Sequence, residues 1–597
     1  MENNPYDSIY SYITSQETAF KQPITLPGNW NWTMKEHIEL SYLYNNSQLS
    51  TGKDEFKPVK NITRPILNLQ HRTEDIDLKD VQLYVNDPSK FHISFLLKKY
   101  HDDVFVVEND LDTFFDELNV QRIDYGGGLS KSTSKFREVV DLHSIAFCDQ
   151  TDILSGPIGI KHFFSPSQLQ EMAKAGWGNR ENGATATIEE TITLARQSKT
   201  EAGEQRSNNT PGKYVEVYEV HGDFPRRFIE PDYQGEEFTY QMHIIAFYTG
   251  KNNKKEWITL YHAEEKENPF MLVKRDPVYG RALGFGGAEE LFEAQVWTNY
   301  DMIRINDMLD AASKTIMITQ DKQLAQRHPG GLKDLDNMEF LYEDPNANTR
   351  QLDTFPRNLA LFENSIAKWQ EHAKEMGASQ DPLTGKESPS GTPFASLQAQ
   401  IQQGLGLHEY RRGQYAKHIE LIYTKDFIKK MMKGLSSGTK FLSELTMDEM
   451  EFVAEGVANN LTNKRIVKAI LRDGKFPTND ERDAIKSVIK EEFKKGGNKK
   501  FLEILKGELK DAEIKVKVNV AGKQKNLPQM VDKIVNIFRF IIANPQGFAQ
   551  LMQVPALQKA FAEILEYSGM SVANFQGLEK LLPPAQPSQL PISEPVA

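Results

Sequence analysis

The clearest spacing of apolar positions lies in the middle of the chain, between Gly284 and Leu435. Residues 287–315 carry apolar side chains that return every three or four positions over more than one stripe, which predicts one long helix buried on two sides. Glu289 and Glu290 would fall in its first turn, where they suit the helix dipole. At ~1.5 Å per residue this helix runs roughly 40 Å, too long for the core of a small domain. A core helix of a large α-rich domain is the plainest interpretation.

A second helix is predicted over residues 355–377. Its apolar residues alternate spacings of three and four, which is a heptad seam. The seam residues are Leu359, Phe362, Ile366, Trp369, Ala373 and Met376. Asp353 or Thr354 is expected to cap the helix, with Pro356 in the first turn. Gly377 is expected to stop it at the C′ position. A seam this regular packs lengthwise against another helix, in the same chain or in a neighbouring copy.

Between the two helices, β-branched and aromatic residues at Ile316–Gln320 and Met338–Asp344 predict a small pair of strands. Residues 378–392 follow the second helix, and they are rich in Gly, Pro and Ser, which predicts an exposed, mobile loop. A third helix begins at Pro393, an N1 proline. Because glycine costs about 1 kcal/mol relative to alanine inside a helix, we expect a kink or break near Gly404–Gly406.

The order of these pieces resembles the core of the portal proteins of tailed double-stranded DNA bacteriophages. By that resemblance, residues 287–315 are the first stem helix, 316–354 the clip, 355–377 the second stem helix, 378–392 the tunnel loop and 393–435 the kinked wing helix. The resemblance rests on order and spacing, since portal proteins lack a short invariant motif.

The resemblance covers residues 212–435 best, and the stretches 61–77 and 148–159 also look like portals from large phages. It implies an α+β fold, mainly helical, with wing, stem, clip, channel loop and a helical C-terminal crown. The remaining segments would be an N-terminal wing region (1–210), a β-rich wing region (211–286), C-terminal wing and crown helices (436–581) and a disordered tail (582–597).

What the resemblance implies about function is a homo-oligomeric ring, dodecameric in that family, at one vertex of the capsid in the virion, assembled in the host cytoplasm. Double-stranded DNA would pass through its channel in packaging and ejection. Its protein partners would be the major capsid protein, the terminase and a neck or tail adaptor. No enzymatic activity, metal, cofactor or membrane is implied. Lys386 in the tunnel loop is the one residue that we expect against DNA phosphate; alternatively, it only keeps the loop soluble.

Composition is compatible with this hypothesis. The chain has 597 residues, of which 39% are hydrophobic and 26% charged, as in an ordinary soluble globular protein. Its single cysteine, Cys148, excludes an intrachain disulfide and a thiolate metal cluster. The net charge of −12 makes the chain a poor duplex clamp, because tight DNA binding requires Lys and Arg to neutralise phosphates. An acidic wall would let DNA slide, although ordinary solubility charge explains the same value.

No catalytic motif is present: there is no G-x-x-x-x-G-K-[ST], H-E-x-x-H, C-x-x-C or G-x-S-x-G. The glycines of Tyr125–Gly128 favour a turn between strands over a phosphate site, because no G-K-[ST] follows. Asp149 and Asp152 could in principle hold a divalent cation, but a solvated turn is the better interpretation.

Three histidines, at positions 221, 243 and 262, fall in a β-rich region without supporting carboxylate spacing, which favours structural roles. Two alternatives to the portal hypothesis remain open. One is a hydrolase or nuclease that uses Asp149, Asp152 or these histidines. The other is a different virion structural protein, such as a minor capsid or tail component.

Elsewhere the alternation of apolar and polar residues predicts further elements. Strands are expected at 78–85, 91–97, 104–107, 214–220, 239–249, 257–262 and 513–520, and helices at 34–44, 109–119, 166–176 and 188–195.

Overall fold

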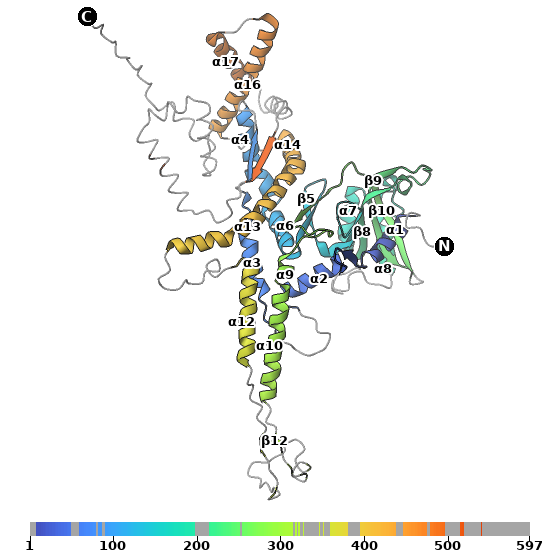
Figure 1. The fold of residues 1–597 in the computed structure, drawn as a ribbon. Coiled ribbons are helices and arrows are strands. Elements are labelled where there is room, and N and C mark those ends of the chain that lie inside the picture. Colours follow the sequence, from blue (N-terminus) through green and yellow to red (C-terminus); the bar gives the residue numbers. More distant parts are fainter. Residues whose placement is uncertain are drawn as a thin grey trace, which may run out of the picture. The chain divides into compact units, whose positions relative to one another are not determined.

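The computed structural model describes residues 8–48, 59–78, 81–85, 90–197, 214–250, 254–313, 359–379, 394–437, 446–474, 478–495 and 514–518, with a few isolated positions between 317 and 351 and at 536 and 539 (Figure 1). The fold is mixed α+β, mainly helical, with several small sheets. The chain divides into two compact units. The first consists of Met1–Glu74 and Phe114–Tyr415, and the second of Asp75–Thr113 and Ala416–Ala597.

A five-stranded antiparallel sheet is the largest sheet of the first unit, in the order β10-β9-β8-β7-β6. Its strands are β6 (Ile145–Phe147), β7 (Ile158–Phe164), β8 (Val215–Pro225), β9 (Phe238–Thr249) and β10 (Lys255–Glu264). The three strands predicted between residues 214 and 262 are therefore confirmed. Alternate residues of β8 point to opposite faces, as the period of two requires.

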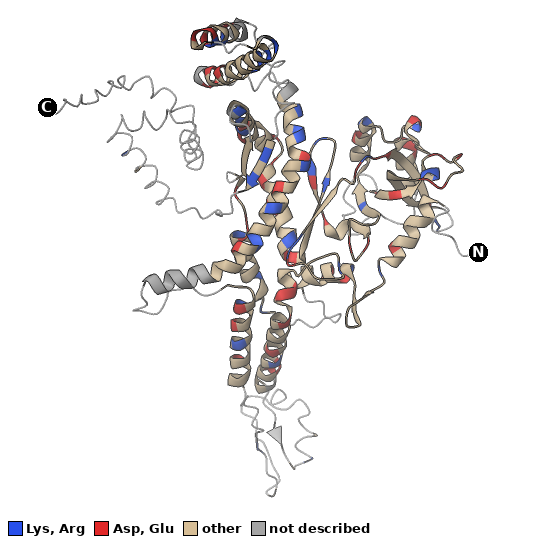
Figure 2. Cartoon of the chain, turned by 45° about the horizontal axis from the view of Figure 1, so that its top comes forward, with Lys and Arg blue, Asp and Glu red and all other residues tan. Residues whose placement is uncertain are grey.

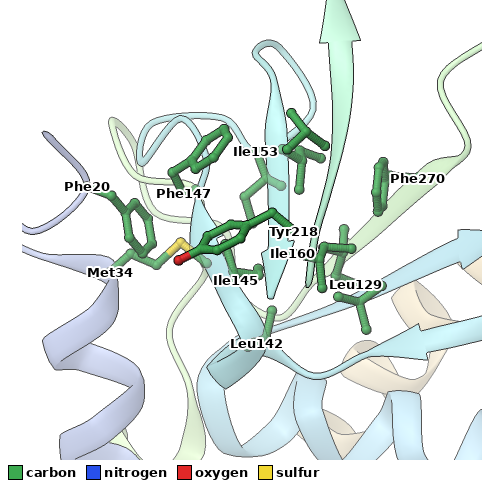
Figure 3. Close-up of a cluster of buried hydrophobic side chains, with 14 of the residues drawn as sticks. Phe20, Met34, Leu129, Leu142, Ile145, Phe147, Ile153, Ile160, Tyr218 and Phe270 are labelled. Atoms are coloured by element: carbon green, nitrogen blue, oxygen red, sulfur yellow. The ribbon is translucent and has the colours of Figure 1, made fainter. Parts of the chain in front are cut away.

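Each face of this sheet has its own core. Tyr218, Val220 and Phe224 of β8 pack in one cluster with α1 (Ile9–Ala19), as Figure 3 shows in part. Val215 and Val217, offset by one residue, pack in the other cluster. That second cluster includes residues of α7 (Pro166–Met172) and α8 (Ile188–Gln197). The helices predicted at 166–176 and 188–195 are thus present, and they cover the second face.

Smaller elements complete this part of the unit. They are β1 (Ile24–Leu26), β2 (Trp30–Trp32), α2 (Met34–Asn45), α3 (Thr63–Thr73) and the 3₁₀ turns Leu142–Ser144, Ala173–Ala175, Arg180–Asn182 and Arg226–Phe228. The helix predicted at 34–44 is confirmed by α2.

A three-stranded sheet, in the order β11-β4-β5, follows helix α6 (Leu111–Tyr125). Its strands are β4 (Gly127–Ser132), β5 (Arg137–Val140) and β11 (Phe270–Lys274). The glycines after Tyr125 were expected to join two strands, and that prediction is wrong, because they join α6 to β4. Gly126 has φ +82°, and a Cβ there would lie 2.3 Å from the carbonyl oxygen of Gly284. The sharp turn and the close backbone approach both require glycine.

The helix predicted over residues 287–315 is not formed as a single helix. The chain forms α9 (Gly287–Glu290), a turn at Leu291 and then α10 (Phe292–Ser313). Leu291 has φ −103° and ψ 0° and is fully buried, so its backbone angles depart from the helix while its amide still donates to Gly287 at 3.2 Å and its carbonyl accepts from Gln295 at 3.0 Å. Leu291 packs in a cluster with Leu67 and Ala373.

The helix predicted over residues 355–377 is present as α12 (Leu359–Met376). Its expected capping residues 353, 354 and 356 lie outside the described residues. Between α10 and α12, the strand predicted at 316–320 appears as β12 (Met317–Ile318). Among the described residues its partner is β13 (Arg350–Gln351), a strand that the sequence did not predict. Residues 338–344 themselves lie outside the described part of the chain.

Helix α13 is one continuous helix from Phe394 to Ile422, so of the predicted kink or break near Gly404–Gly406 the break is absent. A Cβ on Gly406 would meet nothing within 4 Å, so this glycine lies in open space and weakens the helix without breaking it. The irregular turn comes later, as a π-helical segment, η10 (Tyr423–Phe427).

The second unit is mostly helical. Its elements are β3 (Val81–Val85), α4 (Phe91–Tyr100), η3 (His101–Phe105), α5 (Val106–Glu108), η10, α14 (Ile428–Ser437), α16 (Met447–Asp473), α17 (Asn479–Lys495) and β14 (Ile514–Val518). The strand predicted at 513–520 is confirmed by β14, which pairs with β3. The strands predicted at 91–97 and 104–107 are wrong, because both segments are helical.

Candidate functional site

Helices α10 and α12 pack against each other in antiparallel directions (Figure 1). The rings of Trp297 and Trp369 stack with centroids 6.3 Å apart and an interplanar angle of 11°. Further along, the Arg304 guanidinium lies 5.8 Å from the ring centroid of Phe362. The heptad seam of α12 therefore faces its own chain, which decides between the two partners that the sequence left open.

The seam uses only part of the surface of α10, and two apolar stripes remain beside it. Stripe A consists of Phe292, Val296, Tyr300 and Ile303, and stripe B of Met302, Ile305 and Leu309. At about 100° per residue the two stripes point roughly 140° apart around the helix axis, and neither coincides with the seam.

Both stripes are open to solvent in part. Phe292 and Tyr300 of stripe A are 39% and 46% exposed, and Leu309 of stripe B is 48% exposed. On α12, Leu361 is 67% exposed. Large apolar side chains at such exposure along one helix pair form a surface that another protein surface can bury.

Charges along the same helices are mainly acidic (Figure 2). Helix α10 carries one basic residue, Arg304, against four acidic ones, Glu293, Asp301, Asp307 and Asp310. These carboxylates would repel DNA phosphate rather than hold it.

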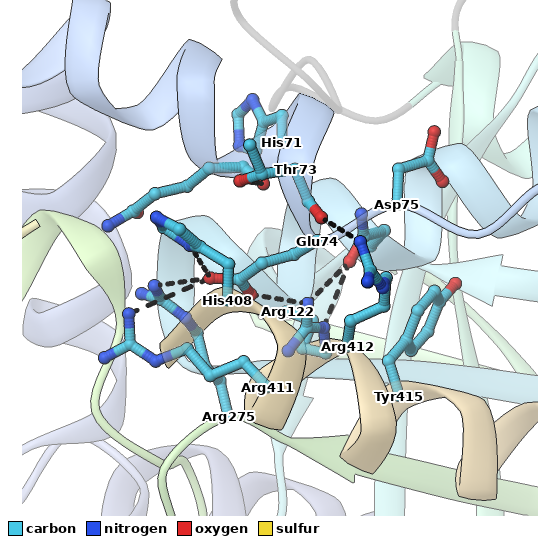
Figure 4. A network of polar contacts seen from close by, with 12 residues as sticks. His71, Thr73, Glu74, Asp75, Arg122, Arg275, His408, Arg411, Arg412 and Tyr415 are labelled. Atoms are coloured by element: carbon cyan, nitrogen blue, oxygen red, sulfur yellow. Dashed lines mark hydrogen bonds and ion pairs between the residues drawn. The ribbon is translucent and has the colours of Figure 1, made fainter. Parts of the chain in front are cut away.

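A buried charge cluster lies where α3, α6, α9 and α13 meet (Figure 4). Glu74, at the end of α3, is fully buried. Its Oε2 accepts from Arg122 at 2.7 Å and its Oε1 from Arg275 at 3.0 Å. His408 Nδ1 lies 3.3 Å from the same Oε1. Burial raises the pKa of Glu74, but Arg275 and Arg122 outweigh it and hold the pKa well below its usual range, so the carboxylate stays ionised.

Arg411 extends the cluster to the start of the α9–α10 segment. Its Nη2 lies 3.0 Å from Glu290 Oε1 and 2.6 Å from Asp276 Oδ2. Glu290 also faces Arg275, at 3.6 Å. The cluster therefore connects α13 to the beginning of the paired helices through side chains that are almost fully buried.

The C-terminus of α12 is fixed by close packing. The predicted stop at Gly377 is confirmed, since α12 ends at Met376, but the left-handed residue is Ala378, with φ +49°. Gly377 is required for another reason: a Cβ there would lie 2.4 Å from Ile66 Cγ2. Gln70 Nε2 also donates to the Gly377 carbonyl at 3.3 Å. Lys386, the predicted DNA-facing residue, lies outside the described residues, as does the rest of the predicted loop after Ser379.

Asp149 and Asp152 form a self-contained turn. Asp149 Oδ1 accepts from the Thr151 amide at 2.7 Å and the Thr151 hydroxyl at 2.6 Å. Burial raises the pKa of Asp149, but these hydrogen bonds outweigh it and lower the pKa. Among the described residues, no group of three or more His, Cys, Asp or Glu side chains is arranged to hold a metal ion.

The three candidate histidines lie on the neighbouring strands β8, β9 and β10, where the rings of His243 and His262 pack edge-on with centroids 5.9 Å apart. His221 bridges two carboxylates, Glu219 at 2.9 Å and Glu265 at 2.8 Å. His243 is bonded to Gln241, and burial lowers its pKa to about 3, so it is neutral. Burial also lowers the pKa of His262. The geometry therefore offers them structural hydrogen bonds, not a general base beside a nucleophile.

In the second unit an Asp, a His and a Tyr side chain are linked in a row. The order is that of a catalytic triad, with a carboxylate that orients a histidine base and a hydroxyl next to that base. His101 Nδ1 lies 2.6 Å from Asp102, and its Nε2 lies 2.7 Å from the Tyr423 hydroxyl. Tyr423 is fully buried, and burial raises its pKa far above the usual range. A hydroxyl that no substrate can reach cannot act as a nucleophile.

No family model matches this sequence, and no curated protein matches it. Within the part of the chain that the structure describes, no helix combines the length and the hydropathy needed to cross a bilayer.

Sequence reasoning missed the Glu74 cluster. Its members are far apart in the chain: Arg122, Arg275 and His408 follow Glu74 by 48, 201 and 334 positions. Each looks like an ordinary surface charge in its local sequence, so no spacing rule could have brought them together.

Proposed function

We propose that this chain is the subunit of a ring that surrounds a DNA channel, in the manner of a phage portal protein. The observation that carries the proposal is the α10–α12 pair, with one seam closed within the chain and stripes A and B left partly exposed. The order of helix, small strand pair, helix and long third helix supports the same assignment, because it follows the portal order.

The two stripes favour a ring over a two-fold dimer. A two-fold dimer uses one self-complementary patch on both copies, whereas a ring needs two different patches that fit each other. Stripes A and B differ in composition, since A contains Phe292 and Tyr300 while B is aliphatic, and they point in different directions. Stripe A of one copy would pack on stripe B of the next, and repeating that contact would close a ring.

The acidic character of α10 supports DNA as the passing molecule rather than a bound one. DNA that must move in both packaging and ejection has to be held weakly, and binding strength grows with the number of phosphates neutralised. In this proposal the ring sits at a capsid vertex, and the major capsid protein, a terminase and a neck or tail adaptor contact it. The predicted DNA-facing role of Lys386 belongs to this proposal.

Particle mass and electron microscopy of the purified chain test the proposal. We expect closed rings with a central hole of at least ~20 Å, the width needed for a duplex. Leu309→Glu puts a charge into stripe B, where the side chain is already half-exposed, so the folded chain should survive while ring formation is lost.

The matched control is Ala367→Glu, which adds the same carboxylate to an exposed position on α12 away from both stripes. We expect it to keep the rings. A chain that stays monomeric at high concentration, or a Leu309→Glu variant that assembles normally, would refute the ring. A stable two-fold dimer or an open filament would point to a different virion structural protein.

A further inference from the structure

His408 is fully buried on α13 and has a hydrogen-bond acceptor at each ring nitrogen. Nδ1 lies 3.3 Å from Glu74 Oε1, and Nε2 lies 3.1 Å from the carbonyl oxygen of Ala378 (Figure 4 shows the Glu74 side). An ionised carboxylate and a peptide carbonyl have no hydrogen to give. A neutral imidazole has one N–H, so it could satisfy one of them and would turn a lone pair toward the other.

We propose that His408 is held doubly protonated and acts as a positioning residue that ties the C-terminus of α12, at Ala378, to the Glu74 cluster. This rests on the proposed function, because residues 378–392 are those that the portal resemblance places in the channel. His408 holds the first residue of that segment, Ala378, and lies on the helix after it.

The charges around His408 make the tie sensitive to pH. The facing groups on the packed elements are Glu74 (end of α3), Arg122 (α6), Arg275 and Asp276 (after β11), Glu290 (α9) and Arg411 (α13). Arg412 of α13, which donates to the Thr73 carbonyl, is a fourth arginine in the cluster. The four arginines outnumber the three carboxylates and oppose a protonated ring, whereas the two acceptors of His408 favour one. As the pH rises and the ring loses a proton, one of the two hydrogen bonds must be given up.

A second contact at the same helix end does not titrate. Gln70 Nε2 donates to the Gly377 carbonyl at 3.3 Å. The amides of Gly377 and Ser379 are themselves bonded to Ala373 and Lys374, at 2.9 and 2.8 Å. Removing Gln70 should therefore lower the protection of this helix end from hydrogen exchange at every pH. Removing His408 should abolish only the part of that protection that depends on pH.

Hydrogen exchange of the full-length chain, read by mass spectrometry from pH 5 to pH 9 and corrected with unstructured peptides, tests the proposal. We expect the amides of residues 377–379 to lose about tenfold in protection as the pH rises, the loss of one hydrogen bond to a charged group. Residues 363–370 of α12, which do not touch the cluster, should show no such change. His408→Phe keeps the ring volume and should show low protection at all pH values.

Two variants complete the design. Gln70→Ala should lower protection while keeping the pH dependence, and His372→Gln, at an exposed histidine of the same helix, should leave the profile unchanged. A flat wild-type profile, or a His408→Phe profile that still depends on pH, would overturn the proposal. Exchange can be measured on rings or on single chains, so a pH-dependent profile in a chain that never assembles would support His408 and refute the ring.

Discussion

The five-stranded sheet and the α10–α12 pair are both rich in large apolar side chains, but only the sheet hides them within the chain. Tyr218 and Phe224 on the sheet are 0% and 2% exposed, whereas Trp297 on α10 is 43% exposed and Leu361 on α12 is 67% exposed. A strand offers two faces, and this chain supplies a helical cover for each. A helix offers its whole circumference, and one antiparallel partner covers a single seam of it. The helix pair therefore leaves large apolar side chains exposed that the sheet does not.

The largest expected loss of stability comes from a substitution in the core of the sheet. Phe224 packs edge-on against Tyr12 with ring centroids 5.2 Å apart, and it also contacts His243. Phe224→Ala should destabilise this part of the chain by ~3–5 kcal/mol, because it leaves a cavity in a closed core. Urea denaturation monitored by near-ultraviolet circular dichroism measures the change.

The control is Leu361→Ala, measured at concentrations below assembly, and it should change stability by less than ~0.5 kcal/mol. Equal costs for the two variants would mean that α12 is covered within its own chain, and the contrast would fail.

Gly377→Ala tests how tightly one end of the helix pair is held. The added methyl group would lie 2.4 Å from Ile66 Cγ2, so α12 must shift away from α3 at a cost of ~1–3 kcal/mol. Thermal unfolding and exchange of residues 371–379 report the change. Gly406→Ala, in open space on α13, should instead stabilise by up to ~1 kcal/mol. A neutral Gly377→Ala would show that this helix end is loose.

The smallest expected effect is a pH dependence confined to the sheet. Burial lowers the pKa of His221, but hydrogen bonds to Glu219 and Glu265 outweigh it, so the pKa lies above the ordinary 6.5. A raised pKa stabilises the fold fully below about 6.5, and that contribution is lost as the pH rises through the folded-state pKa. His221→Gln should remove this loss above pH 6.5. A wild-type chain and a His221→Gln chain with the same pH profile there would contradict it.

Regular patterning predicted some elements of the first unit but not others. Strands β8, β9 and β10 and the seam of α12 followed from periods of two and of three to four, whereas β6, β7 and α1 were not predicted. The segment Phe91–Leu97 was predicted as a strand and is helix α4, because a short apolar run fits either period. The glycines of α13 were predicted to break it, yet later residues of that helix, such as Tyr415 and Ile419, are fully buried, and their packing outweighs a propensity cost of this size.

The candidate site, too, could be predicted only in part. The paired helices could be predicted because each carries its own spacing. Stripes A and B could be separated only after the direction of the seam was known. The Glu74 cluster could not be predicted, because only the fold brings its side chains together and no local sequence pattern indicates that contact.

The two π-helical turns of the second unit, η3 and η10, face each other through His101–Tyr423 and through the rings of Phe105 and Phe427, whose centroids are 5.5 Å apart. A π turn contains one more residue than an α turn, so η3 and η10 each hold one extra residue. The two π turns pack against each other. Deleting a residue from η10 alone would rotate everything after it by roughly 100° and carry buried Met431 of α14 out of its core. The packing of α14 therefore depends on the chain length at these two positions, and a chain shortened at η10 would have to repack α14.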